Sequence, residues 1–368
     1  LEILKVGDIL MTFDRQQPYN DLPLLPPATE LETKAVLKQA IASNRVLANL
    51  RGLAAKIPNQ AILINSIVLQ EARLSSEIEN IVTTSDELYR AAANMDGKAD
   101  PHAKEVLRYR EALYFGIRAI KDRPLHTNLF IQLVQQIKQV NMGIRVIPGT
   151  ALKNVQGEVI YTPPVGEEVI RTKLANLEQF IHAEDDLDPL VKMAVMHYQF
   201  EAIHPFPDGN GRTGRILNLL FLVEKQLIDI PVLFLSRYII THRQDYYDGL
   251  RAITEAQDWE AWVLFMLKAV ESTAQQTFDL VNRILALMDD VRDRVQREAE
   301  GIYSKDLIET IFMQPYTKIS FLVDAGIAKR QTASRYLQTL ASMGILREEL
   351  VGREKYYIND GLLVELTR

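Results

Sequence analysis

The sequence predicts a mostly α-helical protein with one small β-hairpin and a winged helix-turn-helix at its carboxyl end. Apolar residues recur at helical spacing over residues 29–50 and 62–74. Before the carboxyl end, only residues 145–160 combine β-branched residues with glycine turns, the pattern of a hairpin. After Tyr303, two helical patterns separated by a turn at Gly326 precede two strand patterns around Gly352. That order is typical of a winged helix-turn-helix.

Length and composition indicate a globular protein of several units. The 368 residues exceed the usual size of one hydrophobic core, so we expect two or three units. Hydrophobic residues make up 47% and charged residues 24%, and the net charge of -6 argues against a protein that coats a polyanion. The absence of cysteine excludes disulfides and thiolate metal sites. Because no stretch is apolar enough to span a membrane and residues 1–10 lack a secretory signal, we expect a cytoplasmic protein.

We divide the chain into four parts. Residues 1–100 form a helical region that begins with a proline-rich strap at 18–27, and residues 101–276 form the core. Residues 277–302 form a connecting helix, because 288–300 are dense in alternating charge, and Gly301 is its predicted C-cap. Residues 303–368 form the winged helix-turn-helix.

The segment with the strongest chemical signal is residues 204–215, with the sequence HPFPDGNGRTGR. It follows an apolar helix that begins at Asp188-Pro189 and should end at His204, because Pro205 disfavours helical geometry in the residue before it. Glycines let backbone N–H groups approach an anion, and a helix starting near Arg212 would direct its positive dipole end at the same place. The segment therefore predicts a phosphate site.

The other residues of the segment suit a nucleotide with magnesium. Asp208 can share a magnesium ion with phosphate oxygens. Arg212 and Arg215, three apart on a helix, would project from one face as forked donors to the outer phosphates. A histidine with an ordinary pKa of about 6.5 can accept the proton of an attacking hydroxyl, so His204 is the predicted base.

Taken singly, these residues have simpler explanations. Pro-Asp-Gly-Asn-Gly is a common turn composition, and the segment is neither a Walker loop nor a dinucleotide fingerprint. His197 lies two turns before His204 and suggests a metal pair, but a packed helical histidine is the favoured interpretation.

The whole segment resembles the Fic family signature, His-Pro-Phe-x-Asp/Glu-Gly-Asn-Gly-Arg-x-Gly-Arg. Fic proteins typically transfer AMP from ATP to a serine, threonine or tyrosine hydroxyl of a target protein and release pyrophosphate. The resemblance implies a Fic-type helical core with His204 as catalytic base and Asp208 as magnesium ligand. It implies that ATP is bound by Glu79, His204, Gly209, Asn210, Gly211, Arg212, Thr213, Gly214, Arg215, Tyr246 and Tyr247.

Two further segments resemble parts of the same family. Tyr246-Tyr247 is similar to the tyrosine pair that lines the nucleotide pocket, with Tyr247 the stronger candidate for contact, while core packing explains Tyr246 equally well. Residues 147–167 are similar to the flap that binds the target protein, and this flap would align the target by strand addition.

Residues 75–80, with the sequence SSEIEN, resemble the inhibitory motif of the family, Ser/Thr-x-x-x-Glu-Gly/Asn. The resemblance implies inhibitory roles for Ser75, Glu79 and Asn80. Glu79 would pair with Arg215, so that Arg215 cannot orient the γ-phosphate of ATP. An exposed helix carboxylate is the simpler explanation, but an apolar face on this helix favours docking. The same carboxylate would also suit the positioning of a water that removes AMP from a modified protein.

The sequence therefore predicts a self-restrained protein adenylyltransferase that uses Mg-ATP. Removal of AMP, or transfer of another phosphate-linked group, is the alternative chemistry. A hypothesis of another class is a DNA-binding regulator that uses residues 328–336, which contain Lys329, Arg330 and Arg335. From Tyr303 onward the chain has nine Lys/Arg and eight Asp/Glu, and this near balance of charge argues against strong DNA binding. Winged helix-turn-helix domains also dock proteins or form homodimers.

Overall fold

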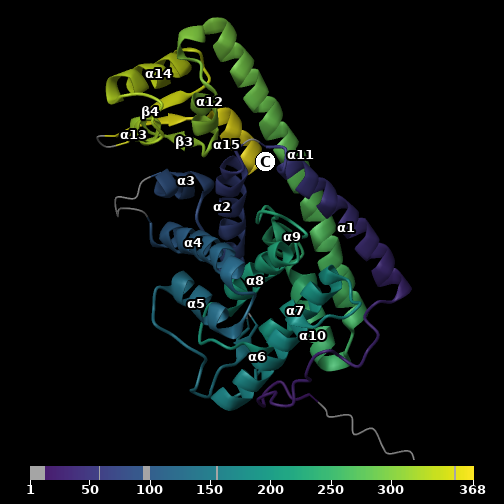
Figure 1. Ribbon diagram of the computed structural model, residues 1–368. Coiled ribbons are helices and arrows are strands. Elements are labelled where there is room, and N and C mark those ends of the chain that lie inside the picture. Colours follow the sequence, from purple (N-terminus) through teal and green to yellow (C-terminus); the bar gives the residue numbers. More distant parts are fainter. Residues whose placement is uncertain (1–12, 58, 94–99, 155, 352–353) are drawn as a thin grey trace, which may run out of the picture.

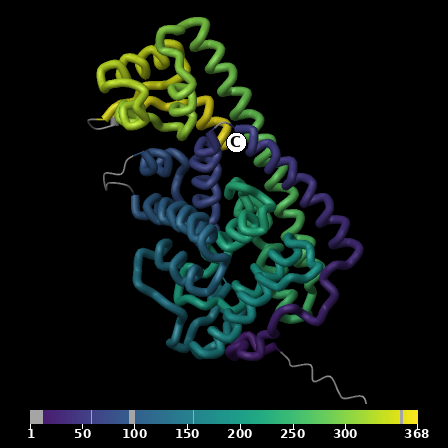
Figure 2. The backbone as a smooth tube through the Cα atoms, in the orientation of Figure 1, coloured from purple at the N-terminus to yellow at the C-terminus, as the bar shows by residue number. Residues whose placement is uncertain are grey.

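A computed structural model describes residues 13–57, 59–93, 100–154, 156–351 and 354–368. The predicted turn at Gly352 and the segment 1–10 lie outside these ranges. Within them, the protein is mostly helical, as predicted, with a helical body and a smaller carboxyl-terminal unit joined by one long helix (Figures 1 and 2). No helix of the described residues has the length and apolar character needed to cross a membrane.

The amino-terminal region consists of α1 (Lys34–Ala54), α2 (Ala61–Ile78) and α3 (Ser85–Ala93). The side chain of Thr33 caps α1 by accepting a hydrogen bond from the N–H of Val36. The inhibitory motif forms the carboxyl end of α2, where Glu79 is the C-cap residue and Asn80 has a left-handed backbone with φ of 61°. Asparagine tolerates this conformation better than most residues, so Asn80 ends the helix.

The core surrounds two consecutive helices, α7 and α8. Its elements are α4 (Pro101–Asp122), α5 (Thr127–Lys138), β1 (Leu152–Lys153), β2 (Val159–Tyr161), α6 (Glu167–His182), α7 (Pro189–Ile203), α8 (Asn210–Glu224), α9 (Leu235–Thr241) and α10 (Arg243–Ala256). Asp188 caps α7 as predicted, and the helix ends at Ile203, directly before His204. Nearly every side chain of α7 is buried, so this helix forms the centre of the core.

The predicted connecting helix is the second half of one continuous helix, α11 (Trp259–Glu298), so the boundary predicted at residue 276 lies inside it. The prediction that Gly301 caps this helix was wrong. Ala299 is the C-cap residue, and its N–H donates to the carbonyl of Val295. The φ of Ala299 is -149°, so the chain becomes extended at this residue. No left-handed residue is needed there, and Gly301 falls in the short 3₁₀ turn Glu300–Ile302.

The carboxyl-terminal unit contains the predicted order of helix, turn, helix and two strands. Its elements are α12 (Lys305–Phe312), β3 (Tyr316–Thr317), α13 (Ile319–Asp324), α14 (Arg330–Ser342), β4 (Arg347–Val351), β5 (Glu354–Ile358) and α15 (Asp360–Thr367). The predicted order is formed by α13, α14, β4 and β5, and Gly326 makes the turn between α13 and α14 with φ of 71°. The strand order is β3-β5-β4, all antiparallel, and α12, β3 and α15 are additions to the prediction.

This unit packs against the helices on both sides of the inhibitory motif (Figure 1). Arg90 of α3 lies 2.7 Å from Glu349 of β4, and Asp86 of α3 accepts a hydrogen bond from the hydroxyl of Tyr316. The last helix, α15, contacts both α11 and α2. The position of α2 and α3 therefore depends on the carboxyl-terminal unit as well as on the core.

Candidate active site

The loop between α7 and α8 holds His204 in a left-handed conformation, with φ of 48° and ψ of 58°. The guanidinium of Arg145 stabilises this turn: its Nε donates to the carbonyl of His204 at 2.7 Å, and its Nη2 donates to the carbonyls of Ile203 and Pro164. The N–H of Arg145 also donates to the carbonyl of Pro205 at 2.9 Å. Carbonyls left open at the end of α7 thereby gain charged donors. The sequence pattern had not indicated Arg145.

Asn210 ties the same loop together from its other end. Its buried side-chain amide accepts a hydrogen bond from the N–H of Phe206 at 2.9 Å and donates one to the carbonyl of Phe206 at 2.8 Å. The predicted phosphate ligand Asn210 therefore uses its side chain to shape the loop. Its backbone N–H remains in the first turn of α8, which begins at Asn210 rather than near Arg212.

Gly209 and Gly211 give access to this first turn. Gly209 is the N-cap residue, with φ of 84°, which disfavours any side chain. At Gly211, a Cβ atom would lie 2.3 Å from Oε1 of Glu79. The carboxylate of Glu79 thus rests directly on the backbone at the start of α8, in the position where the sequence predicted phosphate.

Both arginines of the segment are buried and paired. Arg212 lies 2.7 Å from Glu105 of α4, a partner that the sequence pattern did not indicate. Arg215 lies 2.7 Å from Glu79, and it also donates to the hydroxyl of Ser75 at 2.8 Å and to the carbonyl of Ser75 at 2.9 Å. Burial opposes ionisation of Glu79, but the charge and the hydrogen bond of Arg215 outweigh it and lower the pKa of Glu79. Glu79 is therefore an anion at neutral pH.

Asp208 lies at the open side of the loop, with 60% of its side chain exposed. Its Oδ2 is 2.6 Å from Nζ of Lys138 on α5, and Lys138 is also 3.3 Å from Glu105. Burial opposes ionisation of Asp208, but Lys138 outweighs it and lowers its pKa. The described residues contain no group of three or more histidine, cysteine or acidic side chains that suits a metal ion. Asp208 is thus a single exposed carboxylate, which could hold a magnesium ion only if phosphate and water supplied the other ligands.

The side chain of His204 lies partly buried beside this loop. Burial, and secondarily the positive charge of Arg145, lower its pKa to about 4. Its Nδ1 atom is buried and has no hydrogen-bond partner among the described residues. His204 is therefore a neutral imidazole at physiological pH with capacity to accept a proton.

Other predicted residues divide between core and surface. His197 is a packed histidine: its Nε2 lies 2.8 Å from the hydroxyl of Tyr246, and burial lowers its pKa to about 3. Tyr246 is likewise buried, whereas Tyr247 is 39% exposed beside Arg243, whose guanidinium lies 5.9 Å from the ring centroid. The accessible member of the pair is Tyr247.

Thr213 and Gly214 lie inside the helix pair rather than at its open end. Both are buried, and a Cβ atom on Gly214 would lie 2.5 Å from Oε1 of Glu201 on α7. Gly214 therefore permits close packing of α8 on α7. The structure does not bring its backbone to the loop surface.

The predicted hairpin at 147–167 is anchored close to His204. β1 and β2 are antiparallel, and Leu152 pairs with Tyr161. The hydroxyl of Tyr161 donates to the carbonyl of Ala202 on α7 at 2.8 Å. Ile147, at the start of the hairpin segment, is 81% exposed.

Three family models match successive parts of the chain. Residues 37–118 match the model described as Fic/DOC family N-terminal, and residues 124–222 match Fic/DOC family. Residues 287–362 match the C-terminal domain of protein adenylyltransferase SoFic-like.

Curated relatives share smaller regions. Protein adenylyltransferase fic-1 of Caenorhabditis briggsae is 25% identical over 182 residues, which are 49% of this chain and 34% of the relative. A probable protein adenylyltransferase of Aquifex aeolicus is 36% identical over 84 residues, 23% of this chain and 26% of the relative. The chain thus spans about a third or less of the length of these relatives.

Two solved structures share the fold. A Fic family protein from Desulfovibrio desulfuricans has a TM-score of 0.57 at 20% identity, over 90% of this chain and 98% of that one. Fic-1 from C. elegans has a TM-score of 0.51 at 20% identity, over 66% of this chain and 73% of that one. These similarities confirm the predicted fold class.

We predict that Asn210→Ala destabilises the protein, because it removes two buried hydrogen bonds and leaves the backbone of Phe206 without partners. The free energy of unfolding should fall by about 1–3 kcal/mol, measured by urea denaturation. Asn282→Ala is the matched control, since its exposed side chain donates to the carbonyl of Phe278 within the same helix, and it should change stability by less than about 0.5 kcal/mol. Equal losses in the two variants would contradict the role of Asn210 in the loop.

Proposed function

Because the chain belongs to the Fic/DOC family, we propose that it is a self-restrained protein adenylyltransferase. It transfers AMP from Mg-ATP to a serine, threonine or tyrosine hydroxyl of a target protein. One observation carries this proposal: a partly buried, neutral His204 lies beside a glycine-flanked helix start whose anion position holds the carboxylate of Glu79.

In the proposed reaction, the N–H groups at the start of α8 bind phosphate, and Arg212 and Arg215 hold the outer phosphates. The target hydroxyl attacks the α-phosphorus and gives its proton to His204. The bond from that phosphorus to the oxygen shared with the β-phosphate breaks, and pyrophosphate leaves. A neutral imidazole is required for the proton transfer, which fits the lowered pKa of His204.

Asp208 would hold magnesium, which neutralises phosphate charge when bound. The exposed, ionised carboxylate beside the loop supports this assignment, because magnesium prefers a carboxylate together with phosphate oxygens and water. Tyr247 would contact the nucleotide, and the flap at 147–167 would bind the target by strand pairing next to His204.

Inhibition in this proposal is a competition for Arg215. The γ-phosphate requires the guanidinium that Glu79 already occupies at 2.7 Å, and two anions would repel each other there. Ser75 holds the same guanidinium through its hydroxyl and its carbonyl, so the inhibited geometry has three acceptors on one buried arginine. Asn80 directly follows Glu79, and its left-handed backbone turns the chain away from α2 at that point.

We predict that Glu79→Gly increases the transfer of label from α-labelled ATP to a protein by at least several-fold, because Arg215 becomes free for the γ-phosphate. The measurement is the incorporation of label into cell extract or into the protein itself. Glu77→Gly is the matched control on the same helix, since Glu77 pairs with Arg73 rather than with Arg215, and it should stay within about twofold of the wild type.

Three outcomes decide between the alternatives in that experiment. Equal labelling by the wild type and by Glu79→Gly would reject inhibition. Label from the γ position would indicate kinase-like chemistry, and label from neither position would favour removal of AMP. His204→Ala in the Glu79→Gly background should abolish labelling.

We predict that labelling by Glu79→Gly stays constant between pH 8 and pH 6. The folded-state pKa of His204 is lowered to about 4, so its basic form is complete above that value and is lost only as the pH falls toward it. Glu79 raises the pKa of His204, so its removal lowers the pKa further. The rate should be measured at saturating ATP, and a twofold fall centred near pH 6.5 would mean that His204 titrates as an ordinary histidine.

A second candidate function is DNA binding by the carboxyl-terminal unit. Lys329, Arg330 and Arg335 are exposed at the start of α14, the position of a recognition helix, which supports this candidate. Duplex DNA at low salt should then retain the protein, and Arg330→Ala with Arg335→Ala should abolish retention. Absence of retention of the wild type at low salt would exclude the candidate.

A further inference from the structure

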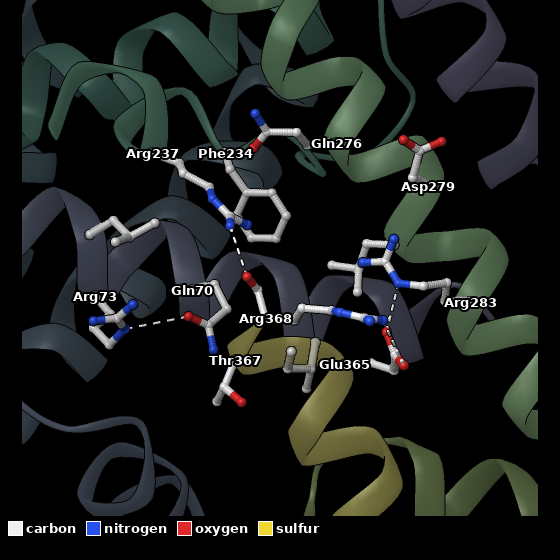
Figure 3. A pocket seen from close by; sticks show the side chains of 13 residues that line it. Gln70, Arg73, Phe234, Arg237, Gln276, Asp279, Arg283, Glu365, Thr367 and Arg368 are labelled. Atoms are coloured by element: carbon white, nitrogen blue, oxygen red, sulfur yellow. Dashed lines mark hydrogen bonds and ion pairs between the residues drawn. The ribbon is translucent and has the colours of Figure 1, made fainter. Parts of the chain in front are cut away.

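A cleft of about 330 Å³ lies where α2, the start of α9, α11 and α15 meet (Figure 3). Gln70, Arg73 and Leu74 of α2 line it. On a helix with 3.6 residues per turn, these positions lie on a different face from Ser75 and Glu79, which contact Arg215. The same helix therefore borders the cleft on one face and carries the inhibitory contact on another.

The cleft has an excess of positive charge. Its charged side chains are Arg73, Arg237, Arg283, Arg368, Asp279 and Glu365. Arg283 lies 2.6 Å from Glu365, and Arg73 lies 3.1 Å from Glu77. With Glu77 counted, four arginine side chains stand against three carboxylate side chains, so the side chains leave an excess of one positive charge.

Of the four arginines that line the cleft, Arg237 is the one whose charge acidic side chains balance least, which leaves its guanidinium for a ligand. Among the described residues, no Asp or Glu side chain is paired with its guanidinium, and its Nη2 donates to a main-chain oxygen of Arg368 at 3.2 Å. In Figure 3 its side chain points toward Arg368 across the cleft. The apolar side chains of Phe234, Leu74 and Leu280 form part of the wall, which strengthens the attraction for an anion.

We propose that this cleft, which we name the arginine cleft, is a binding site for a small phosphate-bearing anion. Guanidinium groups are forked donors whose geometry matches phosphate oxygens, and several of them line one concave space of suitable size. The site is separate from the candidate active site, which uses Arg212 and Arg215.

The anion would connect α2 to the rest of the molecule. Arg73 belongs to α2, Arg237 to α9 and Arg283 to α11. The N–H of Ser236, next to Arg237, already donates to the buried carboxylate of Glu71 on α2 at 3.0 Å. A bound anion between Arg73 and Arg237 adds a second link between the same two elements and holds α2 in place. By holding α2 in place, the bound anion would reinforce inhibition by Glu79, and this part of the proposal rests on the proposed function. Binding of the anion to the cleft does not depend on that function.

The first test uses inorganic phosphate and the full chain, with ionic strength kept constant by sodium chloride. Phosphate should raise the melting temperature of the wild type by about 2 °C or more at saturation, as expected for a ligand of the folded state. Arg237→Gln and Arg73→Gln should each weaken the apparent affinity at least fivefold, measured against the melting temperature of the same variant in chloride. Arg171→Gln is the matched control, because Arg171 is an exposed arginine in a pair with Glu167, and it should respond as the wild type does.

The second test measures amide hydrogen exchange of residues 70–80 with and without phosphate. Exchange in this segment should slow at least threefold in the wild type and should not change in Arg237→Gln. No phosphate effect on the wild type, or an equal effect in Arg237→Gln, would overturn the proposed site. A stability effect without slower exchange in α2 would overturn the link to this helix. Neither readout involves AMP transfer, so failure of the proposed function would be detected separately by the labelling of Glu79→Gly.

Discussion

The burial of Arg215 is the constraint around which the site is organised. A guanidinium that is 2% exposed needs several acceptors, because a buried charge without partners costs several kcal/mol. Among the described residues, the carboxyl end of α2 supplies three: the hydroxyl and carbonyl of Ser75 and the carboxylate of Glu79. The docking of α2 is therefore part of the structural stability of the core as well as a proposed control of its chemistry.

The small residues of the segment follow from the same requirement. Gly211 leaves space for the carboxylate of Glu79 on the start of α8, and Gly214 leaves space for Glu201 of α7. A side chain at Gly211 would displace the carboxylate, and one at Gly214 would push the two helices apart. Close approach of backbone to carboxylate thus explains why glycine alternates with arginine here.

Local signals in the sequence predicted much of the fold. Asp188 with Pro189 marked the start of α7, and Pro205 marked its end, because capping and proline sterics act within a few residues. The two-residue strand β3 is too short for a periodic pattern, and the long α11 crosses the predicted boundary because no breaker interrupts it. The site was predicted from an ordered motif, but Arg145, Lys138 and Glu105 were not. Their partners within residues 204–215 lie 59 or more residues away in sequence, and only tertiary packing brings such groups together.

The continuous helix α11 has a mechanical consequence. Its 40 residues make a rod about 60 Å long, with one end in the core and the other beside the carboxyl-terminal unit. A tilt of one degree at the buried end displaces the distal end by about 1 Å, since the displacement scales with that length. The ion pair between Arg90 and Glu349 connects the carboxyl-terminal unit to α3. A movement of the distal end of α11 therefore reaches the amino-terminal helices without passing through the loop that bears His204.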